Sequence, residues 1–197
     1  MVRRKQIVKA ALMGIALWSS AVADESLGTP WKSYVTLPGA YELGSTTVQP
    51  HEGKNCAFIR SQKDVGVKVH ALIYQAISSG EYRGGKLTLR GFLRTKEVKG
   101  WAGLWVRAED AQGRVLAFQN MMERPVRGNT DWSPHLVDID LPEQTAKVVF
   151  GALLVGQGEV WVDQLSLQGA GPERAIEQLR QKIRSLPEKP TNLGFES

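Results

Sequence analysis

The chain is dominated by short stretches in which apolar and polar residues alternate. In Lys86 to Arg94 (KLTLRGFLR) the leucines fall on one face and most of the charged residues on the other. Trp101 to Ala108 and His135 to Leu141 alternate in the same way. Because successive side chains of a β-strand point to opposite faces, this period of two predicts half-buried strands rather than helices.

Turn-forming residues separate such stretches along almost the whole chain from Trp31 to Gln168. About eight or nine short strands with turn signals between them predict an all-β fold, a two-sheet jelly-roll sandwich. The further stretches that we expect to form strands are Tyr41 to Val48, Asn55 to Arg60, His70 to Ile77, Val148 to Val155 and Glu159 to Leu167.

The pattern changes near residue 170. Ile176, Leu179 and Ile183 recur at helical spacing, and Pro172 suits the first turn of a helix. We expect one C-terminal helix within 170–186, laying its apolar stripe on the sandwich.

The first 23 residues have the layout of a secretory signal peptide. A basic start at residues 3–5 precedes an apolar run from Ala10 to Trp18, and small residues follow up to Ala23. The apolar run is shorter than the roughly 20 residues needed to cross a bilayer. We expect a periplasmic or secreted protein, cleaved near Ala23, with the sandwich in 24–169. The alternative is an amphipathic N-terminal helix that stays on the protein.

Removing that segment changes the charge of the chain. The full sequence has a net charge of +5, and four of its cations but none of its acids lie in the first 23 residues, which leaves +1. Because nucleic-acid binding needs a concentrated basic face, we expect no nucleic-acid partner, and we expect no membrane span. Cys56 is the single cysteine and lies in an apolar run, so we expect a buried thiol.

Four stretches carry a resemblance to a known family: YRGGKLTLRGFLRT (82–95), AGLWVRAED (102–110), NMMERPVRGNTDW (120–132) and FGALLVGQGEVWVDQLSL (150–167). They resemble a largely uncharacterised family of exported bacterial β-sandwich proteins, similar to the galactose-binding-like jelly rolls of carbohydrate-binding modules. Members occur alone or attached to other modules, and some are labelled transcription regulators because of those modules. No helix-turn-helix signal accompanies the domain here. The resemblance implies a sugar-binding domain.

One expected strand face suits sugar binding. Trp101, Trp105 and Arg107 alternate there with small apolar residues. Aromatic rings stack on the apolar faces of sugars, and a guanidinium group donates hydrogen bonds in a fixed fork. The alternative is that a helix or loop covers this face and the tryptophans form a second small core. The next strand and loop add further candidates for ligand contact: Gln119, Asn120, Arg124 and Trp132.

Asp163 shares its strand face with apolar residues, so its carboxylate needs an Arg, backbone N–H groups or a cation. In the resembled jelly rolls, a Glu of an Asn-x-Gly-Phe-Glu element and an Asp of the last strand often hold a structural calcium. Here the element is Asn192 to Glu196, in a tail spanning 187–197. The resemblance implies that the tail docks on the sandwich and that Glu196 and Asp163 are metal ligands. The alternative is a frayed terminus and no cofactor.

Catalytic patterns are missing from the sequence. No Gly-x-Ser-x-Gly occurs. The adjacent Glu109 and Asp110 would face opposite sides of a strand, so they cannot flank one substrate. We therefore expect an exported, non-catalytic domain whose partner is a carbohydrate such as an envelope glycan. Two alternatives stay open: a periplasmic protein-interaction or inhibitor module, and a hydrolase or lyase acting on glycans.

Overall fold

The computed structural model describes residues 27–28, 30–62 and 64–184. The predicted signal peptide, the tail and Glu196 lie outside the described residues. Within them the chain forms nine strands, one short 3-10 turn and one α-helix. In chain order these are β1 (Lys32–Val35), β2 (Tyr41–Thr46), β3 (Cys56–Ser61), β4 (His70–Ser78), η1 (Gly80–Tyr82), β5 (Lys86–Glu109), β6 (Val115–Asn120), β7 (Val126–Asp140), β8 (Lys147–Val155), β9 (Glu159–Ala170) and α1 (Pro172–Arg184).

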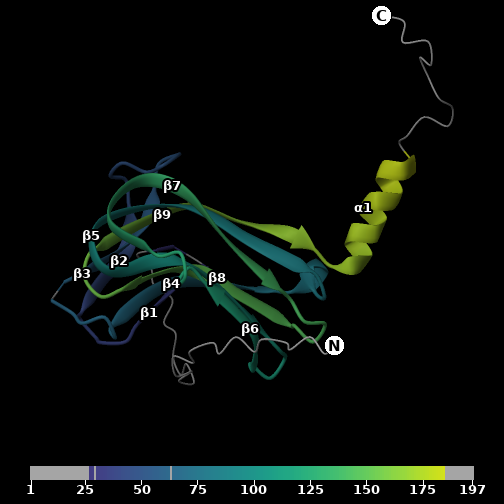
Figure 1. Ribbon diagram of the computed structural model, residues 1–197, viewed down its shortest axis with the longest axis horizontal. Coiled ribbons are helices and arrows are strands. Elements are labelled where there is room, and N and C mark those ends of the chain that lie inside the picture. Colours follow the sequence, from purple (N-terminus) through teal and green to yellow (C-terminus); the bar gives the residue numbers. More distant parts are fainter. Residues whose placement is uncertain (1–26, 29, 63, 185–197) are drawn as a thin grey trace, which may run out of the picture.

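Two antiparallel layers share strand β5 (Figure 1). The first layer has the order β2-β3-β9-β5-β7 and uses the first half of β5. The second layer has the order β1-β4-β8-β5-β6 and uses the second half. This arrangement confirms the predicted all-β sandwich, because each layer needs the other to bury its apolar face.

Strand β5 passes from one layer to the other at a sharp bend. Lys96 still pairs with Glu159 of β9, whereas Trp101 pairs with Val155 of β8. Between them Glu97 adopts a left-handed φ of 52°, which costs energy for a residue with a side chain. A Cβ atom at Gly100 would lie 1.9 Å from the Val155 carbonyl oxygen, so the bend needs glycine there.

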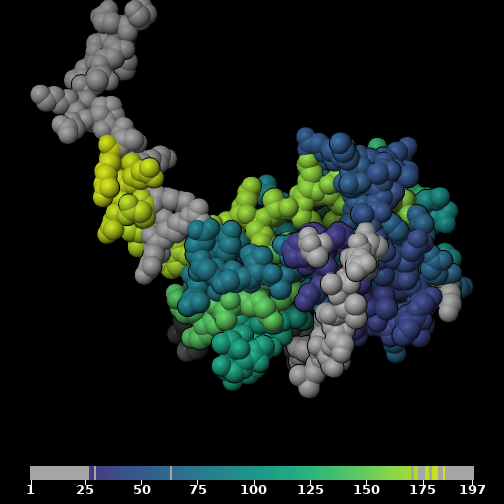
Figure 2. All heavy atoms as spheres, turned by 180° about the vertical axis from the view of Figure 1, so that it is seen from behind, coloured from purple at the N-terminus to yellow at the C-terminus, as the bar shows by residue number. Residues whose placement is uncertain are grey.

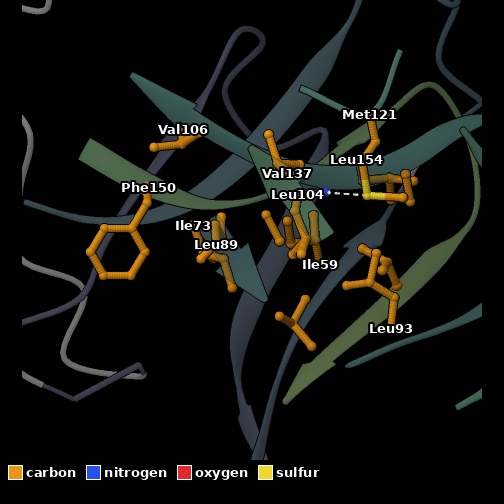
Figure 3. Close-up of a cluster of buried hydrophobic side chains, with 14 of the residues drawn as sticks. Ile59, Ile73, Leu89, Leu93, Leu104, Val106, Met121, Val137, Phe150 and Leu154 are labelled. Carbon is orange, nitrogen blue, oxygen red and sulfur yellow. Dashed lines mark hydrogen bonds between the residues drawn. The ribbon is translucent and has the colours of Figure 1, made fainter. Parts of the chain in front are cut away.

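The main core lies between the two layers. Ile73 of β4, Leu104 of β5 and Leu154 of β8 are at most 1% exposed and meet the apolar face of the first layer (Figure 3). The Leu104 N–H donates to Met121 Sδ at 3.2 Å, which ties the start of the β6–β7 turn to the core. Cys56 is a free thiol, 3% exposed, as predicted, and burial raises its pKa.

Helix α1 begins at Pro172 but does not lie on the sandwich. Ile176 and Leu179 are 50% and 58% exposed, and both views show the helix projecting away from the strands (Figures 1 and 2). The prediction that its apolar stripe covers the sandwich is therefore wrong. A single residue, Gly171, joins β9 to α1, and its N–H donates to the Glu81 carbonyl.

None of the helices in the described ranges is both long and apolar enough to span a bilayer.

Candidate functional site

The second half of β5 presents two large aromatic side chains to the outside of the second layer. Trp101, Trp105 and Arg107 share one face of the strand, because every second residue points the same way. The two indole rings lie in an apolar cluster that is separate from the main core, and they are 9% and 2% exposed. The other buried members of this cluster are Leu72, Tyr74, Val149, Leu153 and Val155, and Tyr34 packs against it.

The burial of these rings bears on the predicted ligand face. Trp101 and Trp105 point outward as expected, but their rings are not an open platform for a sugar. They form the second small core that was the alternative reading of the sequence. The described members of the cluster come from β1, β4, β5 and β8 alone, that is, from one layer. We name this surface the outer face of the second layer.

A row of aromatic rings crosses this outer face from its centre to its edge. The register places Gly151 of β8 between Tyr74 and Trp105, and the missing side chain lets the two ring centroids approach to 6.3 Å. On the other side of Trp105, the ring of Phe118 on β6 lies 6.4 Å away. Phe118 is 49% exposed, so the row runs from buried rings to an open one at the β6 edge.

A charged network lies beside this row. Glu109 is 4% exposed and forms ion pairs with Arg107, two residues away on the same strand, and with Lys147 Nζ at 2.5 Å, directly opposite on β8. The guanidinium carbon of Arg107 lies 5.9 Å from the Trp105 ring centroid. A buried carboxylate needs such compensation, and two cations supply it here.

Among the described residues, two polar ring atoms of this face have no hydrogen-bond partner. Trp105 Nε1 is buried without an acceptor. His70, whose strand neighbour Val155 pairs in turn with Trp101, has a buried Nδ1 atom without a partner. Burial also lowers the pKa of His70 below its ordinary 6.5, so the ring is neutral at pH 7. Buried polar groups nearly always have partners, in protein or in ordered water, so each of these two atoms can form a hydrogen bond with water or with a ligand.

The other predicted ligand residues divide between several places. Asn120 lies opposite Trp105 and so faces the same side, whereas Gln119 lies opposite Val106 and faces the other way. Arg124 is exposed in the β6–β7 turn, where its guanidinium donates to the Leu136 carbonyl at 3.4 Å. The structure therefore brings Trp101, Trp105, Arg107 and Asn120 to one face and leaves out Gln119, Arg124 and Trp132. Sequence reasoning missed Phe118, Glu109 and Lys147.

Trp132 belongs to a cluster on the outside of the first layer instead. The guanidinium of Arg94 lies 4.2 Å from the ring centroid of Trp161 and 5.4 Å from that of Trp132. The imidazole of His51 stacks on Phe92 with their centroids 3.8 Å apart. The Trp132 Nε1–H donates to the Gln49 carbonyl at 3.2 Å. These rings already contact protein groups, so the cluster fixes the segment around residues 49–52 on the sheet.

Asp163 holds the same segment. Its Oδ2 atom accepts hydrogen bonds from the backbone N–H groups of His51 at 2.9 Å and Glu52 at 3.1 Å, and its Oδ1 accepts from Gln164. Backbone donors are thus the partners that its sequence environment requires. The described residues contain no group of three or more His, Cys, Asp or Glu that could hold a metal ion. With Glu196 outside these residues, the calcium site stays a prediction.

Glu109 and Asp110 diverge as predicted. Glu109 faces the charged network, whereas the Asp110 carboxylate closes the β5–β6 turn. Asp110 Oδ1 accepts from the backbone N–H groups of Gln112 at 2.9 Å and Arg114 at 2.8 Å. The two adjacent carboxylates cannot act on one substrate.

Two hollows open elsewhere on the surface. One, of about 280 Å³, lies beside β3 and β9 and is lined by Trp31, Cys56 and Asp163 among others. The other, of about 250 Å³, lies at the bend of β5 and includes Glu97 and Glu159. The carboxylates of Asp163 and Glu159 are already engaged, the first by backbone N–H groups and the second by Arg60.

The amino-acid sequence is similar to that of a bacterial protein. No protein-family model matches the chain. A Bacillus subtilis (strain 168) protein named "Uncharacterized HTH-type transcriptional regulator YbfP" is 33% identical over 166 residues. That match covers 84% of this chain and 56% of the relative, so the chain spans little more than half of its length.

Several solved structures have the same fold at low sequence identity. The enzymatically active domain of bacteriophage CBA120 tailspike protein 4 has a TM-score of 0.59 at 12% identity, over 76% of this chain and 20% of that one. The CBM22-1 xylan-binding domain of Paenibacillus barcinonensis Xyn10C has a TM-score of 0.50 at 12% identity, over 77% and 92%. A family 16 carbohydrate-binding module has a TM-score of 0.50 at 12% identity, over 76% and 97%. The jelly-roll sandwich is therefore shared with carbohydrate-binding modules.

Proposed function

We propose that this protein is a carbohydrate-binding domain whose ligand lies on the outer face of the second layer, along the edge formed by β5 and β6. The observation that carries the proposal is the buried Trp105 Nε1–H, for which the described residues provide no acceptor, on a ring whose centroid lies 6.4 Å from that of the half-exposed Phe118. Sugars offer both an apolar face for stacking and hydroxyl oxygens that accept hydrogen bonds. The fold shared with a xylan-binding domain and a carbohydrate-binding module supports the same conclusion.

Binding at this edge needs only a local movement. Phe118 lies over one side of Trp105 and is half-exposed, so its side chain can change rotamer at low cost. In the proposed complex a ligand hydroxyl oxygen accepts a hydrogen bond from the indole N–H of Trp105, for which the described residues provide no acceptor. Phe118 stacks on the sugar ring, and Asn120, which shares the face with Trp105, contributes a further polar contact.

The proposed activity is binding without catalysis, outside the cytoplasm. Glycoside hydrolysis uses two carboxyl groups on either side of the scissile bond. Among the described residues of this face, the strand register places one carboxylate, Glu109, and both of its oxygens are held by cations. The basic and apolar segment before Ala23 supports export.

A binding panel with matched variants tests the proposal. Calorimetry against soluble xylan, galactan, polygalacturonate and peptidoglycan fragments should show at least one saturable ligand. Trp105→Phe removes the N–H donor but keeps an aromatic body, and Phe118→Ala removes the exposed ring. Each should weaken binding by about five- to tenfold, the value of one hydrogen bond or stacking contact.

Trp161→Phe is the matched control, because it changes an indole in the same way on the first layer. It should leave affinity unchanged. Absence of binding to every glycan, or an equal loss in the Trp161→Phe protein, would contradict a sugar site at this edge.

A further inference from the structure

The outer face of the second layer carries more positively charged side chains than negatively charged ones. We infer that the sugar bound there carries a carboxylate, as a uronic acid does. This inference rests on the proposed function and names the ligand class of the same site. It follows from the charges that the strand register brings to the face, and from the way in which the single carboxylate among them is already used.

The register sets the charge balance. Lys32 of β1 lies opposite Tyr74, so it faces the same side as the aromatic row. Arg107 and Lys147 lie on that side too. The described strands thus bring three cations to this face and one carboxylate, Glu109. This excess of positive charge attracts an anionic ligand and repels a cationic one.

Glu109 cannot serve as an acceptor for the ligand. One of its oxygens pairs with Arg107 and the other with Lys147. The remaining polar groups of the site are mainly donors: the Trp105 N–H, the two cationic side chains, and the Asn120 amide, whose Oδ1 already accepts from the Met122 N–H at 3.0 Å. A face that mainly donates fits a ligand that mainly accepts.

Exposure decides which cation meets the ligand first. The Lys147 side chain is 46% exposed, whereas that of Arg107 is 16% exposed. The Lys147 ammonium has three donors, so it can donate to a ligand carboxylate while it stays paired with Glu109, and Arg107 stays behind it on Glu109. Salt screens partly buried charges less than fully exposed ones. Part of the attraction between Lys147 and a ligand carboxylate therefore remains at physiological salt.

The test compares one glycan with and without its charge. Oligogalacturonate and its carboxyl-reduced counterpart have the same linkage and length, and they differ in the carboxylates. The acidic form should bind at least tenfold more tightly, and the difference should shrink as salt is raised from about 50 to about 500 mM. Dextran sulfate and dextran form a second pair, which separates a requirement for carboxylate from attraction to any polyanion.

Two variants with the same charge change locate the effect. Lys147→Gln should reduce the preference for the acidic form several-fold, because the acidic form loses more affinity than the reduced form. Lys86→Gln is the control, because Lys86 is 64% exposed at the start of β5 in the first layer. It should change neither affinity.

The outcomes separate the inference from the function on which it rests. Equal affinity for the acidic and reduced forms would overturn the acidic ligand and leave sugar binding intact. Preference for dextran sulfate as strong as that for oligogalacturonate, or an equal effect of Lys86→Gln, would overturn a specific carboxylate contact. Failure to bind any glycan would overturn the proposed function itself.

Discussion

The exchange of Glu109 for glutamine tests whether the charged network is a buried, mutually dependent unit. Glu109 is 4% exposed, and its two oxygens compensate Arg107 and Lys147. Glutamine keeps the shape of the side chain but removes the charge. Arg107, whose side chain is 16% exposed, then loses its ion pair with Glu109 in a largely buried site.

The expected loss can be worked from the two pairs. Removing one partner of a buried ion pair costs about 3–5 kcal/mol. A pair with a half-exposed lysine contributes at most about 1 kcal/mol. Because Glu109→Gln breaks both pairs but leaves amide groups able to hydrogen bond, we expect a loss of about 3 kcal/mol in the free energy of unfolding. For a chain of this size that is a fall in Tm of about 6–12 °C.

Thermal and urea unfolding measure this loss directly. Lys147→Gln is the control, since it breaks only the half-exposed pair and should cost no more than about 1 kcal/mol. A Glu109→Gln protein that loses less than about 1 kcal/mol would refute the reasoning, because Arg107 would then not depend on Glu109. A larger loss in Lys147→Gln than in Glu109→Gln would refute it as well.

Two further predictions concern other parts of the molecule. Asp163→Ala should cost about 2 kcal/mol and speed hydrogen exchange at the His51 and Glu52 amides, whose acceptor it removes; unchanged exchange there, or an equal effect in Asp138→Ala, would count against it. Burial lowers the pKa of His70 and His135 below 6.5, so the unfolded chain takes up protons first as pH falls, and Tm should drop from about pH 6.5 downward. The His70→Gln, His135→Gln double variant should flatten that fall, and an identical pH profile would contradict it.

Much of the fold could be predicted because the period-two pattern is local. Each alternating stretch became part of a strand, and the Cys56 thiol is buried as its apolar neighbours indicate. The continuity of β5 could not be predicted. Its bend at 96–100 falls between two stretches that were predicted separately, Lys86 to Arg94 and Trp101 to Ala108. The chain is paired with β9 before the bend and with β8 after it, and no local pattern reveals those pairings. The direction of α1 was also hidden, because it depends on the contact of Gly171 with the η1 turn.

Part of the candidate site could be predicted from the sequence. Alternation alone puts Trp101, Trp105 and Arg107 on one face, and the same rule could have added Glu109 two residues further. Lys147 and Phe118 reach the site through pairing with β8 and β6, which no local pattern reveals. Whether the tryptophans would be open or covered was undecidable from residue type, since the same rings suit a sugar platform and a small core.

The indole N–H resonance of Trp105 tests the central claim most directly. In a ¹H–¹⁵N spectrum recorded during titration with oligogalacturonate, or with whichever glycan the panel identifies, an unpartnered N–H that gains an acceptor should move strongly downfield and saturate with the binding isotherm. The Trp161 resonance, from the first layer, should stay in place. A saturable ligand that moves Trp161 and leaves Trp105 unchanged would contradict binding at the outer face of the second layer.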